Sequence, residues 1–337
     1  MGERGENKEV DTGARQGAVA AGGAARRLGG VMLPFPTPFD ARGELDLAAL
    51  RANLARWNAA GVSGYVALGS TGERVHLDEA ESLRVVEAAR GAVPREMIFV
   101  VGVGQQSTRE TIKEARRAAD AGADALLVIT PHFYRAAMTQ AALAEHYERV
   151  ADESTAPVVV YSIPQNTGVT LAAETVARLS RHGNIIGLKE SSGDVVAFVE
   201  MLRVASDEFA MLTGHGSALH AALSSGARGA ILAVACCALR TTSAIARAVE
   251  AGDHERARTL QRRLIPLARA VTTRFGIGGL KVALDRAGYS GGTVRAPLSM
   301  PDEAARAEIA RLVAELADSE GARPVDGKAG GPEGAAT

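Results

Sequence analysis

The most informative side chain in the sequence is a lysine at the end of an apolar run. Of the 38 lysine and arginine residues, only five are lysine: Lys8, Lys113, Lys189, Lys281 and Lys328. Lys189 follows Ile185-Ile186-Gly187-Leu188, a run that indicates a buried strand. Arginine stays protonated, whereas a desolvated lysine can lose its proton and attack a carbonyl carbon. For Lys189 alone, a strand-end lysine that reaches into solvent is the simpler interpretation.

A lysine that attacks a carbonyl carbon forms an imine, and this reaction needs proton carriers and hydrogen-bond donors nearby. Residues of these kinds follow other predicted strands. Tyr161 ends one strand, and Ser70 and Thr71 lie in a Gly-Ser-Thr-Gly turn after another. A tyrosine can carry protons, and such a turn can offer N–H groups and hydroxyls to the carboxylate of a keto acid. Burial favours the neutral, nucleophilic form of an amine. Singly, the turn fits a plain connection and Tyr161 fits a core residue, but together with Lys189 they favour Schiff-base chemistry.

Eight short apolar runs, alternating with amphipathic helical stretches, predict the scaffold for these groups. The predicted strands are Val31–Leu33, Gly64–Leu68, Met97–Gly102, Ala125–Ile129, Val158–Tyr161, Ile185–Lys189, Phe209–Leu212 and Gly229–Leu232. Continuous apolar runs are typical of parallel strands buried on both faces. Eight strand–helix units predict an α/β protein with a (β/α)8 TIM barrel, whose strands all end at one rim. An open doubly wound sheet is disfavoured, because Pro34-Phe35-Pro36-Thr37-Pro38 replaces the glycine-rich loop after the first strand.

The same pattern divides the chain into four segments. We expect a disordered tail over 1–29, the barrel over 30–251, a C-terminal helical region over 252–317 and a second disordered tail over 318–337. Both tails are rich in glycine and alanine and lack a sustained apolar period.

Composition and charge argue against several other classes of protein. The net charge of -1 gives no electrostatic case for nucleic acid or an anionic membrane, and no apolar run is long enough to span a bilayer. The adjacent Cys236 and Cys237 predict no disulfide framework and a reducing, cytoplasmic location. The histidines form no close ligand pair at a shared strand end, so we expect no metal. His215, which follows the seventh strand, is the histidine most worth attention.

These residues make the chain resemble the dihydrodipicolinate synthase/N-acetylneuraminate lyase family of class I pyruvate-dependent aldolases. The similar segments span the whole barrel in order: Gly69–Glu73, Gly122–Ala125, Thr130-Pro131, Tyr161–Pro164 with Thr167-Gly168, and Asn184–Asp194.

The resemblance implies a role for each matched residue. Lys189 would form the imine with pyruvate, and Tyr161 would shuttle protons. Thr71 would relay protons, and Ser70 with Thr71 would bind the carboxylate. The resemblance also implies a homotetramer of two tight dimers and a covalent lysine imine with no cofactor. We expect four further residues from later strand ends to complete the substrate site: Asn166, Ser191, Gly214 and Ile231.

Within the family, the chain is most similar to the 4-hydroxy-2-oxoglutarate aldolases, through segments 161–168, 273–281 and 288–298. It departs from the family at two positions. Lysine-pathway synthases have an arginine, which grips the carboxylate of the aldehyde, where this chain has Asn166. Members usually have a tyrosine, lent across the dimer interface to extend the proton relay, where this chain has Phe133. Tyr134, His132 or a water would have to replace that hydroxyl.

We therefore expect a Schiff-base aldolase that cleaves a 4-hydroxy-2-keto acid, 4-hydroxy-2-oxoglutarate, to pyruvate and the aldehyde glyoxylate. Three alternatives stay open. The first is 4-hydroxy-tetrahydrodipicolinate (dihydrodipicolinate) synthase, and the second is a lyase or dehydratase of sugar-derived 2-keto-3-deoxy acids. The third is a keto-acid-binding sensor without turnover, which Phe133 favours.

Overall fold

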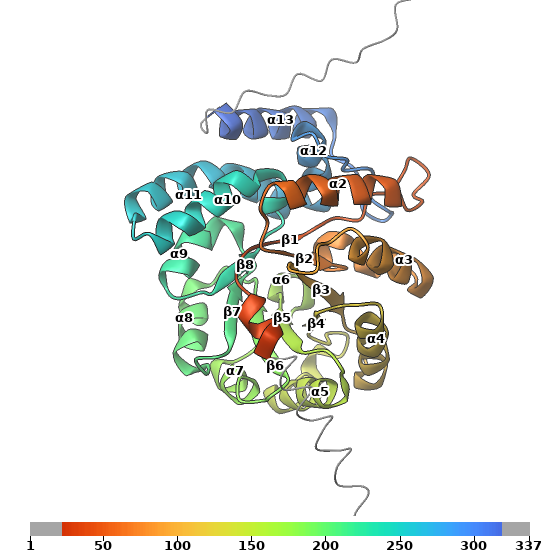
Figure 1. Ribbon diagram of the computed structural model, residues 1–337, viewed down its shortest axis with the longest axis vertical. Helices are drawn as coiled ribbons and strands as arrows, with labels where there is room; N and C mark the ends of the chain where they lie inside the picture. The colour runs from red at the N-terminus through yellow and green to blue at the C-terminus, as the bar shows by residue number, and fades with distance from the viewer. Residues whose placement is uncertain (1–21, 319–337) are drawn as a thin grey trace, which may run out of the picture.

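Eight parallel strands close into a barrel in the order in which they occur along the chain (Figure 1). The computed structural model describes residues 22–318. The strands are β1 (Gly30–Pro34), β2 (Gly64–Ala67), β3 (Ile98–Val103), β4 (Ala125–Ile129), β5 (Val158–Ser162), β6 (Ile185–Glu190), β7 (Ala210–Thr213) and β8 (Gly229–Ile231). The predicted (β/α)8 barrel is confirmed, and every predicted strand is present.

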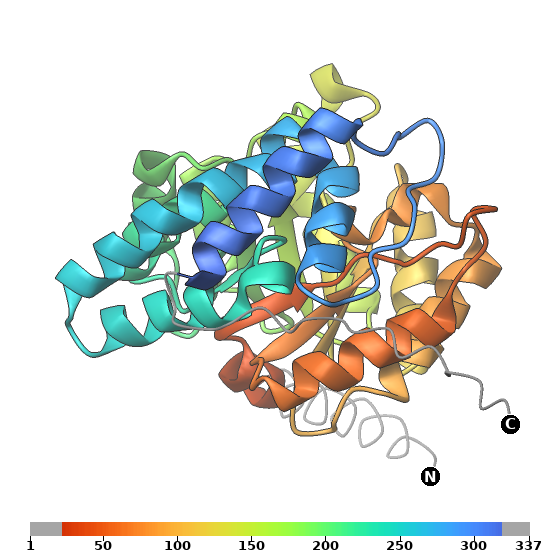
Figure 2. The ribbon, with the colours of Figure 1, turned by 90° about the horizontal axis from the view of Figure 1, so that it is seen from above.

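Helices surround the barrel and then continue beyond it. Those that follow the strands are α2 (Leu47–Ala59), α3 (Glu79–Arg90), α4 (Thr108–Asp120), α5 (Gln140–Glu153), α6 (Pro164–Thr167), α7 (Ala173–Leu179), α8 (Val195–Val204), α9 (Leu219–Ser224) and α10 (Ala235–Glu250). The chain continues into α11 (His254–Arg269), α12 (Gly276–Arg286) and α13 (Glu303–Asp318). Figure 2 shows these last three helices gathered on one side of the barrel, where α11 packs against α10. The predicted C-terminal helical region is therefore present.

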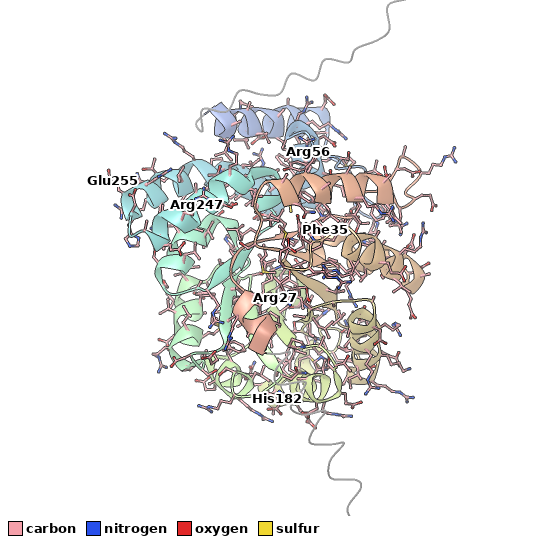
Figure 3. All side chains as sticks on the ribbon, viewed as in Figure 1. Arg27, Phe35, Arg56, His182, Arg247 and Glu255 are labelled. Carbon is pink, nitrogen blue, oxygen red and sulfur yellow. The ribbon has the colours of Figure 1, made fainter. Side chains whose placement is uncertain are left out.

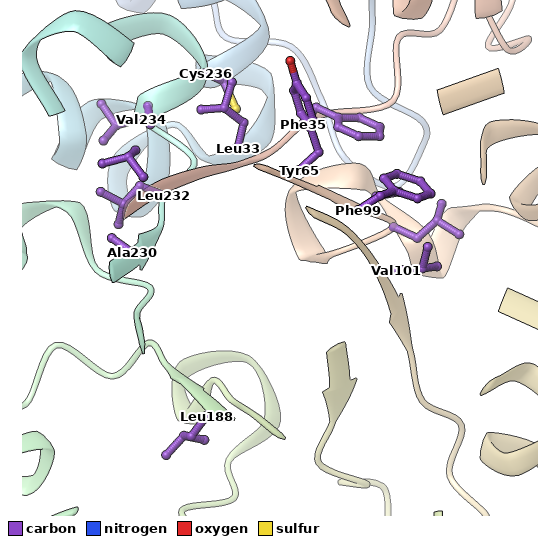
Figure 4. Close-up of a cluster of buried hydrophobic side chains, with 14 of the residues drawn as sticks. Leu33, Phe35, Tyr65, Phe99, Val101, Leu188, Ala230, Leu232, Val234 and Cys236 are labelled. Atoms are coloured by element: carbon purple, nitrogen blue, oxygen red, sulfur yellow. The ribbon is translucent and has the colours of Figure 1, made fainter. Parts of the chain in front are cut away.

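Two apolar cores lie on either side of the sheet. One set of strand residues, including Met32, Val100 and Leu127, fills the barrel interior. Their neighbours along the strands, such as Leu33 and Phe99, belong to the core between the sheet and the helices (Figure 4). This alternation follows from the two-residue period of a strand. The interior is therefore a packed core, as is usual for such barrels.

Local signals in the sequence set the helix boundaries. Asp78 accepts a hydrogen bond from the N–H of Glu81, and the Glu81 side chain accepts one from the N–H of Asp78. This reciprocal capping box starts α3. Gly122 follows α4 with a φ of 96°, a conformation that favours glycine and turns the chain toward β4.

The predicted N-terminal tail over 1–29 is wrong for residues 22–29. Residues 22–27 form a helix, and Ala24, Ala25 and Leu28 are buried in the core that fills the barrel interior. Arg27, labelled in Figure 3, forms an ion pair of 3.1 Å with Asp124 at the start of β4. The helix therefore lies across the N-terminal ends of the strands, in front of the barrel in Figure 1.

This helix was not predicted because residues 22–27 show no repeating apolar pattern and contain no large apolar side chain. Residues 1–21 and 319–337 lie outside the described residues. Of the tail predicted from residue 318 onward, only Asp318 is described, and it ends α13.

Candidate active site

Lys189 and Tyr161 face each other on neighbouring strands at the carboxyl ends of β6 and β5. Ile186 is an extra residue near the start of β6, and this bulge shifts the register. From Gly187 onward the pairing is regular, and Lys189 lies opposite Tyr161. Lys189 is 5% exposed and Tyr161 is 4% exposed. The Lys189 Nζ lies 4.2 Å from the centre of the Tyr161 ring. The buried amine thus has its predicted proton carrier beside it.

The turn after β2 brings a second hydroxyl to the tyrosine. Ser70, Thr71 and Gly72 form a single 3-10 turn, held by N–H bonds from Gly72 to Gly69 and from Glu73 to Ser70. The Ser70 Oγ lies 3.2 Å from the Tyr161 hydroxyl oxygen, within hydrogen-bond distance. The hydroxyl next to Tyr161 is therefore that of Ser70, whereas the resemblance had implied Thr71 as the relay. Thr71 is buried in the same turn.

Gly214 makes the room that the lysine arm and Ser191 occupy. A Cβ added at Gly214 would lie 1.9 Å from the Ser191 Oγ and 2.9 Å from the Lys189 Cε. No side chain fits there without moving one of these groups. The Ser191 hydroxyl therefore lies close to the lysine arm, and it is buried without a hydrogen-bond partner among the described residues. A buried hydroxyl without a partner is unfavourable unless a ligand or water satisfies it.

The loop after Lys189 is held in place by hydrogen bonds. The N–H of Ser191 donates to the carbonyl of Ser162, and the Gln165 side chain donates to the carbonyl of Ser191. The buried Glu190 carboxylate accepts the N–H of Ser192 at 2.8 Å. Burial raises the pKa of Glu190, and the hydrogen bonds from Ser192 oppose that shift. These bonds fix the position of Ser191 relative to Lys189.

The remaining predicted site residues differ in how deeply they are buried. Ile231 is buried in the barrel interior, in the same apolar core as Tyr161. Asn166 is exposed on the short helix α6. Phe133 and Tyr134 are 73% and 71% exposed and contact each other edge to face, with ring centres 5.1 Å apart.

Two further hydroxyls near the site, those of Thr130 and Ser162, were not among the predicted site residues. Thr130 directly follows β4, and Ser162 is the last residue of β5. Both are fully buried, and each hydroxyl lacks a hydrogen-bond partner among residues 22–318. Ser162 directly follows Tyr161. The signal that could have identified them is their position, because each follows an apolar run at the rim that carries the site.

His215 lies at the rim after β7, and burial lowers its pKa. Its ring packs over Gly193, where an added Cβ would lie 2.8 Å from the His215 Cδ2. Within residues 22–318, no three His, Cys, Asp or Glu side chains gather in a group that could hold a metal ion. No helix in that range is long and apolar enough to cross a membrane.

A model of the dihydrodipicolinate synthetase family matches residues 27–316. The chain belongs to this family. Members are aldolase-type lyases, so the protein is an enzyme of that type.

Known family members are similar over nearly their whole length. A 4-hydroxy-tetrahydrodipicolinate synthase of Hyphomonas neptunium is 40% identical over 81% of this chain and 93% of its own. One of Methanothrix thermoacetophila is 36% identical over 87% of this chain and 98% of its own. A prophage protein of the family from E. coli K12, solved in complex with pyruvate, is 31% identical with a TM-score of 0.80, over 86% of this chain and 98% of that one.

Proposed function

We propose that the protein is a class I aldolase that forms an imine between Lys189 and a 2-keto acid and releases pyruvate. The observation that carries this proposal is the buried Lys189 amine, 4.2 Å from the centre of the Tyr161 ring, whose hydroxyl lies 3.2 Å from that of Ser70. The amine, the acid/base group and a second hydroxyl are the parts that imine chemistry requires. The reaction needs no cofactor or metal, since the iminium itself is the electron sink.

The steps follow from the positions of these groups. The neutral Lys189 amine attacks the C2 carbonyl of the substrate and forms a carbinolamine. Tyr161 donates the proton with which the carbinolamine hydroxyl leaves as water, which gives the iminium and a tyrosinate. Tyr161 accepts the proton of the 4-hydroxyl as the C3–C4 bond breaks, which releases the aldehyde and leaves an enamine. Ser70 is placed to exchange that proton with Tyr161. Protonation of the enamine at C3 and addition of water then release pyruvate and restore the amine.

We further propose 4-hydroxy-2-oxoglutarate as the substrate, with glyoxylate as the aldehyde product. Asn166 is neutral, so it cannot clamp a carboxylate with the paired, charge-assisted bonds of an arginine. The unpartnered hydroxyl of Ser191, next to Lys189, supports a site that binds a further polar group of the substrate. We propose that Ser191, Ser192 and N–H groups near Gly214 receive that group.

A second candidate function is 4-hydroxy-tetrahydrodipicolinate synthase, the condensation of pyruvate with aspartate semialdehyde. It is favoured by the description of the curated relatives from Hyphomonas neptunium and Methanothrix thermoacetophila. Both functions use the same lysine imine, so they differ in the aldehyde and not in the nucleophile.

The experiment that separates the two measures both reactions on the unmodified protein. Cleavage of 4-hydroxy-2-oxoglutarate is followed by pyruvate release, and condensation is followed with pyruvate and aspartate semialdehyde. A higher kcat/KM for cleavage supports the aldolase. Efficient condensation with slow cleavage would assign the synthase activity instead, and failure of both would leave the lyases of sugar-derived keto acids or a sensor.

We also propose that the protein assembles as a homotetramer. The exposed large apolar side chains include two neighbouring pairs, Phe133 and Tyr134 on the loop after β4 and Val196 and Val199 on α8. Exposed apolar patches often mark contacts between chains. Sedimentation of the unmodified protein would test this, and a monomer at assay concentration would contradict it.

A further inference from the structure

The side chain of Lys281 is completely buried, although it carries a charge and lies in the C-terminal helical region. It lies on α12, with 0% of the side chain exposed, and its ammonium pairs with the Glu73 carboxylate at 2.6 Å. The Glu73 side chain is itself 1% exposed. We call this pair the Glu73–Lys281 clasp. It joins the turn that carries Ser70 and Thr71 to a helix outside the barrel.

The ammonium of Lys281 has further partners from two other segments. It donates to the carbonyl of Thr37, in the loop after β1, at 2.8 Å and to the carbonyl of Thr293. It also lies 4.5 Å from the centre of the Phe39 ring. Three segments that are distant in sequence therefore meet at one buried charge: the loops after β1 and β2, and the C-terminal region.

The other end of the clasp is fixed equally well. The second oxygen of the Glu73 carboxylate accepts the backbone N–H of Arg295 at 3.1 Å and lies 3.2 Å from the Nδ1 of His76. The guanidinium of Arg295 in turn binds both oxygens of Glu81 and the carbonyl of His76. The C-terminal segment is thus joined to the loop after β2 by several hydrogen bonds and ion pairs.

The clasp lies directly beside the turn that faces Tyr161. Glu73 ends this turn with a φ of 54°, a left-handed conformation that is unfavourable for a residue with a side chain. The hydroxyl of Thr37, whose carbonyl binds Lys281, donates to the carbonyl of Gly72 at 2.7 Å. Both ends of the segment that begins at Ser70 are therefore constrained, one by the Tyr161 contact and the other by the clasp.

We propose that Glu73 and Lys281 are positioning residues that set the Ser70–Thr71 turn against Tyr161 and the bound keto acid. This inference rests on the proposed binding of pyruvate by that turn. Buried ion pairs often add little net stability compared with apolar side chains of similar volume, so stability alone does not account for this one. Through the clasp, the C-terminal helical region acts on the geometry of the active site without touching the substrate.

The test removes both charges together in the full-length protein. A single substitution would leave one buried charge without its partner, which is strongly destabilising. The double variant Glu73→Gln/Lys281→Met avoids this, because it removes both charges. The matched control is Glu110→Gln/Lys113→Met, because Lys113 and Glu110 form an exposed ion pair on α4. Borohydride trapping with pyruvate measures the fraction of protein molecules in each preparation whose Lys189 reacts. Rates are then expressed per reactive site.

We expect the double variant to show a KM for pyruvate in imine formation that is raised roughly 10- to 100-fold, with a lower kcat for cleavage per reactive site. The control should keep the kinetics of the unmodified protein. A clasp that only stabilises the fold would lower the melting temperature and the number of reactive sites but leave KM per site unchanged. Unchanged KM and kcat per site in the folded double variant would overturn the inference.

Glu73→Asp provides a second test if the double variant does not fold. It keeps the charge but shortens the side chain by one methylene, so the turn must move or the ion pair must lengthen. We expect a raised KM for pyruvate with Lys189 still trapped at saturation, and unchanged kinetics would again overturn the inference. If the unmodified protein gives no pyruvate adduct at all, the proposed function fails and the inference fails with it.

Discussion

Lys189 and Tyr161 lie directly opposite each other in the register of β5 and β6, with the amine 4.2 Å from the centre of the phenol ring. Both side chains are buried, so the ring shields the amine from water on that side. A nucleophile and its proton carrier are thus held by two adjacent strands of the barrel. Strands hold such groups more rigidly than loops do.

Lys189 is expected to be the residue that pyruvate labels. Borohydride with pyruvate should inactivate the protein and place the adduct mass on the peptide that contains Lys189. Lys189→Arg should be as inactive as Lys189→Ala, because a guanidinium stays protonated. Lys281 is the internal control, since it is also buried but is paired with Glu73. Labelling at Lys281, or at no lysine, would contradict the mechanism.

Tyr161→Phe should keep the fold and the imine but lose turnover by ~10²–10⁴-fold, the usual contribution of a positioned acid/base group. Ser70→Ala should give a smaller loss of turnover, because Tyr161 keeps its own hydroxyl and loses only the Ser70 hydroxyl beside it. The rate of cleavage in a single turnover is measured for both variants. Each rate is divided by the amount of imine that borohydride traps in the same preparation. A loss below tenfold in Tyr161→Phe would assign the proton transfer elsewhere, with Tyr134 or His132 the next residues to test.

Gly214→Ala should impair imine formation, because the added methyl would collide with the Ser191 hydroxyl and the Lys189 Cε. We expect at least a roughly tenfold lower rate of pyruvate trapping, since small displacements of reacting groups reduce rates strongly. Gly183→Ala is the control, because an added Cβ there has nothing within 4 Å. Adding Ser191→Gly to Gly214→Ala should restore part of the rate. Equal trapping rates in Gly214→Ala and the control would show that the close contact is unimportant.

Asn166→Arg should shift the reaction toward condensation with aspartate semialdehyde, since an arginine can clamp a carboxylate with two charge-assisted bonds. The gain should be limited, because Phe133 still lacks the hydroxyl that extends the relay in the family. The ratio of condensation to cleavage in the variant and in the unmodified protein is the measurement. A ratio that does not change would mean that position 166 does not contact the aldehyde.

The stability of the protein should fall between about pH 6.5 and pH 4 through His146. Burial lowers the pKa of His146 to about 4, and its Nδ1 lies 2.9 Å from the Thr108 hydroxyl. In this range the unfolded chain binds a proton that the folded protein does not, so unfolding becomes easier as the pH falls. The full effect is about 3 kcal/mol, from a shift of roughly 2.5 units.

Urea unfolding at several pH values measures this dependence. His146→Gln should flatten the slope between pH 6.5 and 4, while His254→Gln, at an exposed position, should leave it unchanged. A slope that persists in His146→Gln would assign the acid sensitivity to other groups.

The barrel and the two main site residues were predictable because their signals are local. Strands buried on both faces are continuously apolar, and Lys189 and Tyr161 each end such a run. The partner of the Tyr161 hydroxyl was not predictable in this way, because Ser70 and Thr71 are adjacent and only the 3-10 turn decides which one faces the tyrosine. The resemblance implied Thr71 as the relay, and in the structure the Ser70 hydroxyl lies within hydrogen-bond distance of the Tyr161 hydroxyl.

The network around Lys281 was beyond sequence analysis, because its partners are far apart in the chain. Lys281 and Thr37 are 244 positions apart, and nothing local to either indicates the contact. The scarcity of lysine was the one available signal. The chain uses arginine for nearly all its positive charges, yet it has a lysine at two buried positions, 189 and 281. Lys281 and Arg295 are the partners that hold Glu73.

The helix over 22–27 bears on where a shortened form of the protein can begin. Ala24, Ala25 and Leu28 fill the end of the barrel interior that is opposite the chemistry. A form that starts at residue 30 would keep every proposed catalytic group but expose part of the barrel interior to water, which favours aggregation. Poor solubility of such a form would therefore say nothing about the reaction. We therefore expect the minimal folding unit to include the segment from residue 22, which composition alone had assigned to a disordered tail.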